Sequence, residues 1–169
     1  KLSNASLRVE FRHPQFSGVM PNTYSQLYIH LVFAVKYREA LIGEAFEQPL
    51  FNYIGEIVTQ EQQILMAING MPDHIHLAIT IRPNQSISNL VRTIKSNSSR
   101  FLSQEMDTRF RWQNGFGAFS FSPSHKTRVI RYIQNQKIHH NGQAFQAEYL
   151  KLLQKHDITY DDKYLFDWI

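Results

Sequence analysis

Two histidines separated by one residue, His74 and His76, are the part of this sequence best suited to chemistry. They follow Met71-Pro72-Asp73, which is typical of a turn, and they begin a run of apolar and β-branched residues that predicts a strand. Because side chains alternate between the faces of a strand, both imidazoles project from one face and Ile75 from the other. The pair can share a metal ion if a third group closes the site. Such pairs alone more often have one ring in the core and the other hydrogen-bonded or in water.

Tyr132 and Gln136 are spaced one turn apart in a predicted helix over 125–140, for which Ser124 is the expected N-cap. The i, i+4 spacing places both side chains on one face. Tyr132 offers a phenol nucleophile, and Gln136 offers a carbonyl oxygen as a third metal ligand. Two imidazoles and one amide oxygen leave open positions on an ion, as in catalytic metal sites. Taken singly, Tyr132 also fits a packing tyrosine, and Gln136 fits a surface residue.

These groups together predict phosphodiester chemistry. A metal ion would polarise the phosphodiester and stabilise charge that develops on the leaving 3′ oxygen. The phenol would attack in line and remain attached to a 5′-phosphate, which divides one difficult step into two reversible steps.

Basic residues are concentrated after the histidine pair. The 169-residue chain has a net charge of +4, and residues 86–140 contain nine lysines and arginines against two acidic residues. This distribution suits a polyanion such as nucleic acid, although a solvated basic surface gives the same count.

A helix is predicted over 86–103, with Ser86 as its N-cap. The face opposite its apolar stripe carries only cations and small polar groups, which can all donate to phosphate. An ordinary wet face generally includes acidic residues as well. The expected DNA contacts are Arg92, Lys95, Ser99 and Arg100 on this helix, with Lys36, Arg38 and Arg131 elsewhere.

The order of predicted elements indicates an α+β fold: a ferredoxin-like split β-α-β sandwich with an antiparallel central sheet. His30, in the first strand, could face the same side as the histidine pair or be a hydrogen-bonded interior residue. Pro49 suggests that the first helix begins at that residue. The predicted strands are 24–35, 63–69, 74–82 and 115–122, and the predicted helices are 44–60, 86–103, 125–140 and 145–154.

Length and composition favour a single domain over 20–169. Residues 1–19 show no regular period and precede Met20, so we interpret them as an upstream or cloning-derived extension. The absence of cysteine excludes disulfides and thiolate metal sites. No apolar run approaches the ~20 residues that span a bilayer.

The sequence resembles the single-tyrosine HUH transposases of bacterial insertion sequences, including the relatives associated with repetitive extragenic palindromes. The resemblance runs from about Tyr24 to Tyr160 in the family's order and spacing. The matching stretches are His30-Leu31-Val32-Phe33, Lys36-Tyr37-Arg38, Met71-Pro72-Asp73-His74-Ile75-His76, Trp112-Gln113-Asn114-Gly115-Phe116-Gly117-Ala118-Phe119, Val129-Ile130-Arg131-Tyr132-Ile133-Gln134-Asn135-Gln136, His139-His140 and Phe145-Gln146-Ala147-Glu148.

The resemblance implies that Tyr132 is the nucleophile and that His74, His76 and Gln136 hold Mg²⁺ or Mn²⁺. Ligand softness alone favours Mn²⁺ or Zn²⁺. His139 and His140 are rival ligands within a turn of Gln136.

The resemblance further implies cleavage and rejoining of single-stranded DNA with hairpin ends by a homodimer, in which one subunit's tyrosine helix can complete the other subunit's histidine pair. The expected location is cytoplasmic and nucleoid-associated, without a membrane partner. One alternative is a replication-initiation or relaxase-type HUH nuclease, although many of these have a third histidine and extra domains. Another is a non-catalytic nucleic-acid-binding module, because the same sandwich serves RNA recognition.

Overall fold

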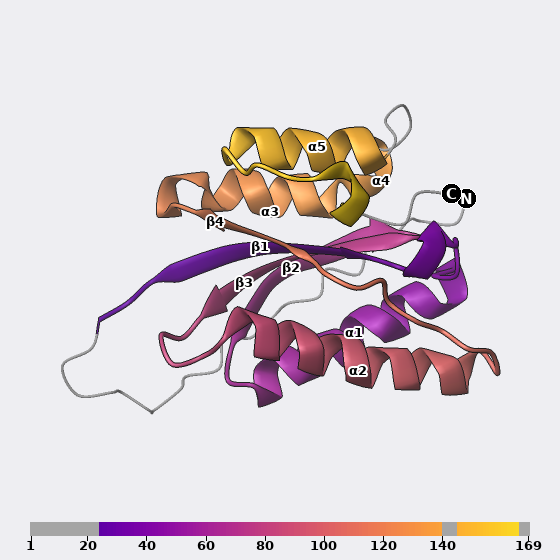
Figure 1. The fold of residues 1–169 in the computed structure, drawn as a ribbon. Helices are drawn as coiled ribbons and strands as arrows, with labels where there is room; N and C mark the ends of the chain where they lie inside the picture. Colours follow the sequence, from indigo (N-terminus) through magenta and orange to yellow (C-terminus); the bar gives the residue numbers. More distant parts are fainter. Residues whose placement is uncertain (1–23, 140–144, 166–169) are drawn as a thin grey trace, which may run out of the picture.

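The computed structural model of the chain describes residues 24–139 and 145–165, and the interpreted extension 1–19 lies outside them (Figure 1). Four strands form one sheet in the order β2-β3-β1-β4, and every neighbouring pair is antiparallel. This arrangement confirms the predicted ferredoxin-like α+β fold. The strands are β1 (Leu27–Ala34), β2 (Ile64–Met71), β3 (His74–Ile81) and β4 (Gly117–Phe121).

Helices cover both faces of the sheet, which lies between them as the middle layer (Figure 1). One face packs against α1 (Glu44–Gln60) and α2 (Ile87–Glu105). The other packs against α3 (Lys126–Gln134), α4 (Gln136–His139) and α5 (Phe145–Lys155). The short 3-10 turns are η1 (Lys36–Arg38), η2 (Pro123–His125) and η3 (Asp162–Tyr164). No helix within the described ranges is both long enough and apolar enough to cross a membrane.

The main core lies between the sheet and the pair α1 and α2. Ile75, Leu77 and Ile79 alternate along β3 and are fully buried against this pair. Burying a side chain of this size contributes roughly 1.5–3 kcal/mol, so this face supplies most of the hydrophobic stabilisation. The intervening residues of β3 face α3–α5, and the strand thereby presents the histidine pair to the second layer.

The first helix has the predicted range 44–60, but it does not begin at Pro49. It starts at Glu44, and Pro49 lies inside it rather than at its first turn. The buried residues Leu50, Ile54 and Val58 follow Pro49 along one face, while Phe46 before it also packs on the core. Packing on both sides of the proline therefore outweighs the loss of one backbone hydrogen bond.

The predicted N-cap of α2 is confirmed, because the Ser86 side chain accepts a hydrogen bond from the backbone N–H of Asn89. The predicted helix over 125–140 is instead two helices. Asn135 leaves helical geometry with φ −96° and ψ 17°, so α3 ends before it and α4 follows. The side-chain amide of Asn69 on β2 donates to the carbonyl of Gln134 at 2.8 Å, which holds the end of α3 on the sheet. At the other end, Ser124 lies within η2 and does not cap the helix.

Backbone hydrogen bonds from other segments hold the turn between β2 and β3 in place. The carbonyls of Pro72 and Asp73 accept hydrogen bonds from the backbone N–H groups of Ile42 and Val35, at 2.9 and 2.8 Å. A side chain at Gly70 would collide with the backbone of β3 at His74. Glycine is therefore needed for the close approach of the strand that carries the histidines.

Candidate active site

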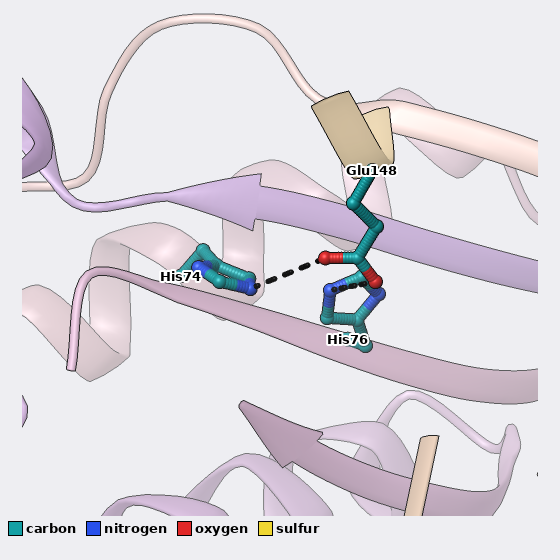
Figure 2. A group of neighbouring side chains, drawn as sticks. All are labelled: His74, His76 and Glu148. Atoms are coloured by element: carbon teal, nitrogen blue, oxygen red, sulfur yellow. Dashed lines mark ion pairs between the residues drawn. The ribbon is translucent and has the colours of Figure 1, made fainter. Parts of the chain in front are cut away.

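His74 and His76 point from β3 toward the layer formed by α3, α4 and α5. Their ring centroids are 5.2 Å apart, and their side chains are 1% and 0% exposed. Figure 2 shows both rings beneath the carboxylate of Glu148, which comes from α5. The expectation that the two imidazoles share a face is met.

Each histidine is oriented by a partner at its Nδ1 atom. Nδ1 of His74 lies 2.6 Å from Oδ1 of Asp73, and Nδ1 of His76 lies 3.0 Å from Nε2 of His30. These contacts direct both Nε2 atoms toward Glu148, at 3.9 Å from Oε2 and 3.7 Å from Oε1. Metal-binding histidines are typically held in this way by groups behind them. His30 is thus an interior hydrogen-bonded histidine that also faces the pair.

The two supporting groups have fixed protonation states near neutral pH. Burial, followed by the charges of His156 and Lys155, lowers the pKa of His30 to about 3, so this imidazole is neutral. Burial disfavours ionised Asp73, but the hydrogen bond with His74 and the Arg38 guanidinium outweigh it and lower its pKa to about 2. A neutral His30 can accept at Nε2 a hydrogen bond donated by Nδ1–H of His76, and this tautomer leaves Nε2 of His76 as a lone-pair donor.

Glu148 completes a group of three side chains that could hold a metal ion. One ligand atom from each of His74, His76 and Glu148 lies within 4.8 Å of the others, and all three residues are buried. Two imidazole nitrogens and one carboxylate oxygen are a common donor set for divalent transition metals. The donor chemistry and the arrangement therefore fit a divalent cation.

Tyr132 and Gln136 reach the same carboxylate although the helix between them is broken. The hydroxyl of Tyr132 donates to Oε1 of Glu148, and Nε2 of Gln136 donates to the same oxygen at 3.0 Å. Within the described part of the chain, the buried Oε1 atom of Gln136 has no hydrogen-bond partner, so it is available to an ion. Burial and the Glu148 charge raise the pKa of Tyr132, so its phenol is protonated at neutral pH.

Sequence reasoning missed Glu148. Its helix buries Phe145, Tyr149 and Leu153 on one face, and Glu148 lies on that face among them. An acidic residue on the apolar face of an amphipathic helix is rare unless it is paired, and this signal was available in the sequence. The rival ligands cannot be placed, because His140 and the side chain of His139 lie outside the described residues.

Three of the four expected DNA contacts on α2, Arg92, Lys95 and Ser99, border a cleft of about 530 Å³ on the opposite face of the sheet from the histidines. We call this the α2 cleft; its lining includes Lys36, Arg92, Lys95, Ser99, Arg111 and Trp112. Nζ of Lys95 donates to the carbonyl oxygens of Gln113, at 2.8 Å, and Gly115. Burial lowers the pKa of Lys95 to about 8. Lys95 therefore ties α2 to the segment that contains Gln113 and Gly115, and it also contributes charge to the cleft.

Three other expected DNA contacts lie apart from this cleft. Arg38 forms an ion pair with Asp73, with Nε 2.7 Å from Oδ2, and its guanidinium lies 4.4 Å from the ring centre of Phe145. Arg38 is thus placed to support the histidine site. Arg100 is exposed and donates to Oδ1 of Asn97 at 2.7 Å, and Arg131 is exposed on α3.

Comparisons with known proteins place the chain in a family. The family described as IS200-like transposases matches residues 23–136. The ISDra2 transposase TnpA of Deinococcus radiodurans is 28% identical over 119 residues, which cover 66% of this chain and 84% of that protein.

Two solved structures share the fold. One, from Deinococcus radiodurans, is described as a transposase; it has a TM-score of 0.57 at 24% identity, covering 68% of this chain and 94% of that chain. The other is a REP-associated tyrosine transposase bound to a REP hairpin, with a TM-score of 0.55 at 17% identity, covering 79% of this chain and 75% of that chain. Since the family match spans more than half of the sequence, this chain belongs to the IS200-like transposase family.

Proposed function

We propose that this transposase cleaves and rejoins single-stranded DNA at insertion-sequence ends through a covalent bond between Tyr132 and a 5′-phosphate. The observation that carries the proposal is that a tyrosine hydroxyl and two buried imidazoles meet at one carboxylate. Glu148 accepts the Tyr132 hydrogen bond and lies within 4 Å of Nε2 of both His74 and His76. A REP hairpin bound to a protein of the same fold supports a DNA substrate with a hairpin.

His74, His76 and Glu148 would hold the cation, and Gln136 would add its carbonyl oxygen. A bound divalent cation, Mg²⁺ or Mn²⁺, would polarise the scissile phosphodiester and stabilise charge on the leaving 3′ oxygen. The imidazoles favour Mn²⁺, whereas the carboxylate and amide oxygens also suit Mg²⁺. Asp73 and His30 fix the histidine rings, so the ligands are organised before the cation binds.

Glu148 is placed to act as the general base for the Tyr132 hydroxyl. The phenol is protonated at neutral pH, so it must lose its proton as its oxygen bonds to phosphorus. Oε1 of Glu148 already accepts this hydrogen bond and would take the proton. The bond between phosphorus and the 3′ oxygen breaks, and that oxygen gains a proton from water. In rejoining, the oxygen of a strand's 3′ hydroxyl bonds to phosphorus and its proton passes to water. The bond between phosphorus and the Tyr132 oxygen breaks, and the phenolate recovers its proton from Glu148.

The experiment uses a pool of fluorescent single-stranded oligonucleotides, each with a hairpin and a randomised flank, incubated with Mn²⁺. Wild-type protein is expected to carry fluorescence on a denaturing gel, and Tyr132→Phe is expected to carry none, because the covalent bond needs the phenol oxygen. Sequencing of the attached DNA would give the cleavage site. Absence of an adduct from every pool, or an equal adduct in Tyr132→Phe, would contradict the proposal.

We further propose a homodimer, because excision requires two strand ends to be held covalently and each chain offers one nucleophilic tyrosine. Tyr132, Gln136 and Glu148 meet His74 and His76 within one chain. Dimerisation would therefore pair two sites rather than supply a missing ligand. Sedimentation of the protein with a hairpin oligonucleotide is expected to give two chains per complex, and a single chain would contradict this part of the proposal.

A further inference from the structure

A second cleft opens beside Tyr132, on the face of the sheet that carries the histidines. It measures about 820 Å³ and lies between β4, α3 and α5, so we call it the α3–α5 cleft. Tyr132, Glu148 and His30 line it, so it is continuous with the candidate active site. None of the DNA contacts expected from the sequence borders this cleft.

The walls of the α3–α5 cleft are basic. Arg128 projects from α3 one turn before Tyr132, and Lys151 and Lys155 are one turn apart on α5. All three side chains are exposed, and within residues 24–139 and 145–165 none of them forms an ion pair. Glu148 is the one acidic residue in the lining, and it belongs to the catalytic group. The charge of the walls is therefore available to a polyanion.

Two aromatic residues also line the cleft: Phe119, which is buried, and Phe121, which is partly exposed. Phe119 and Phe121 come from β4, the edge strand of the sheet. Phe121 is half-buried and stacks on Tyr28 with a centroid distance of 5.4 Å, and the Phe119 ring lies 5.0 Å from that of His156. Basic walls with aromatic rings between them are the combination by which proteins bind single-stranded nucleic acid: cations contact phosphates while bases stack on rings.

We propose that the α3–α5 cleft binds the single-stranded DNA next to the scissile phosphate and delivers that phosphate to Tyr132. Arg128, Lys151 and Lys155 contact the backbone phosphates, and a base lies against Phe121. The inference rests on the proposed cleavage of single-stranded DNA by Tyr132. It assigns the unpaired strand to the α3–α5 cleft, on the opposite side of the sheet from the α2 cleft.

The test measures binding in the Tyr132→Phe background, where no covalent bond can form. The probe is a fluorescent oligonucleotide of about 12 thymidines, which has no hairpin. Lys151→Gln with Lys155→Gln is expected to weaken its binding about tenfold near 0.1 M salt and to reduce the salt slope by about 1.4 through two lost phosphate contacts. Phe121→Ala is expected to weaken binding about fivefold or more, because base stacking is lost.

The control is Lys137→Gln with Lys163→Gln, which removes the same number of charges from exposed lysines outside the cleft, each of them paired with a carboxylate. This control is expected to change affinity less than twofold. Equal losses in the control and in the Lys151/Lys155 variant would overturn the inference, since they would show a general charge effect. Thermal melting of each variant separates a folding defect from a lost contact.

Crosslinking gives a second readout that does not depend on a substitution. The Tyr132→Phe protein is irradiated with the same oligonucleotide carrying a photoreactive thymidine. Crosslinks are expected in peptides containing residues 119–121 or 151–156. Crosslinks confined to α2 would overturn the inference.

The inference and the proposed function can fail separately. If wild-type protein forms the adduct but the Lys151/Lys155 variant binds the strand as tightly as its parent, the proposed function holds and strand binding in the α3–α5 cleft is contradicted. No wild-type adduct together with the expected losses of binding would overturn catalysis by Tyr132 and leave the cleft as a strand-binding site.

Discussion

The two faces of the sheet are built from the same alternating strands, yet they hold different kinds of residue. The face toward α1 and α2 buries apolar side chains such as Leu31, Phe33 and Leu77. The face toward α3–α5 buries His30, His74 and His76, and its apolar clusters are smaller. One face stabilises the fold, and the other places reactive groups in a buried setting.

Buried polar side chains are tolerated on the second face because their contacts are arranged in a chain. Asp73 contacts His74, His30 contacts His76, and Glu148 contacts both Tyr132 and Gln136. A buried polar group without such partners would cost roughly 1–3 kcal/mol. The comparison suggests that the reactive face depends on this chain of contacts, whereas the other face depends on packing.

The largest effects are expected from shortening one side chain on each face of β3, which tests whether one face provides stability and the other binds a cation. Leu77→Ala is expected to lower the free energy of unfolding by about 2–5 kcal/mol, since it removes buried methyl groups and leaves a cavity. His76→Ala is expected to cost less stability and to remove the rise in melting temperature that Mn²⁺ gives wild-type protein. Urea unfolding and melting with and without Mn²⁺ measure both effects. A rise with Mn²⁺ that persists in His76→Ala would contradict the assigned cation site.

A second test removes the charge of Asp73, the carboxylate that contacts His74 at Nδ1. Asp73→Asn keeps the size of the side chain but removes the charge that faces both His74 and Arg38. The affinity for Mn²⁺ is expected to fall about 10- to 100-fold, because His74 loses the carboxylate that orients it. Calorimetric titration with Mn²⁺ measures the change. Gln134→Ala, on an exposed residue of α3, is the control and should leave Mn²⁺ affinity unchanged.

The sequence predicted the division of the sheet because alternation along a strand is a local property. His74 and His76 had to share a face as soon as β3 was recognised. The i, i+4 spacing singled out Tyr132 and Gln136, and the family resemblance implied their roles. The structure brings both to the same group although Asn135 interrupts their helix. That interruption was not predicted, because the contact of Asn69 with the end of α3 spans 65 residues.

Long-range partners also explain what else was missed. Glu148 meets His74 across the fold, and no local spacing relates them. The ion pair between Arg38 and Asp73 was not predicted either, because the turn after β2 brings the two side chains together only in the fold. The basic walls of the α3–α5 cleft come from two helices and act together only after folding. Local patterns thus predicted elements and faces, whereas the contacts between layers required the structure.

The smallest expected effect is a change in stability with pH that is due to Lys95, on the side of the sheet that faces α1 and α2. Burial lowers its pKa from 10.5 to about 8, so between these values the unfolded chain binds a proton that the folded chain does not. The free energy of unfolding should therefore rise with pH from about 8 to 10.5, by about 1 kcal/mol after allowance for solvent screening. Below pH 8 both states hold the proton, so this contribution does not vary with pH.

Urea unfolding of wild-type protein and Lys95→Met between pH 7 and 10.5 isolates this contribution, because other titrating groups are common to both. The difference in the free energy of unfolding is expected to shift in favour of wild type as the pH rises. A difference that stays constant would mean that the Lys95 ammonium is stabilised by the carbonyls of Gln113 and Gly115 enough to cancel its burial. The apolar face would then also tolerate a charge through hydrogen bonds, and the division between packing and polar contacts would be weaker than the buried residues indicate.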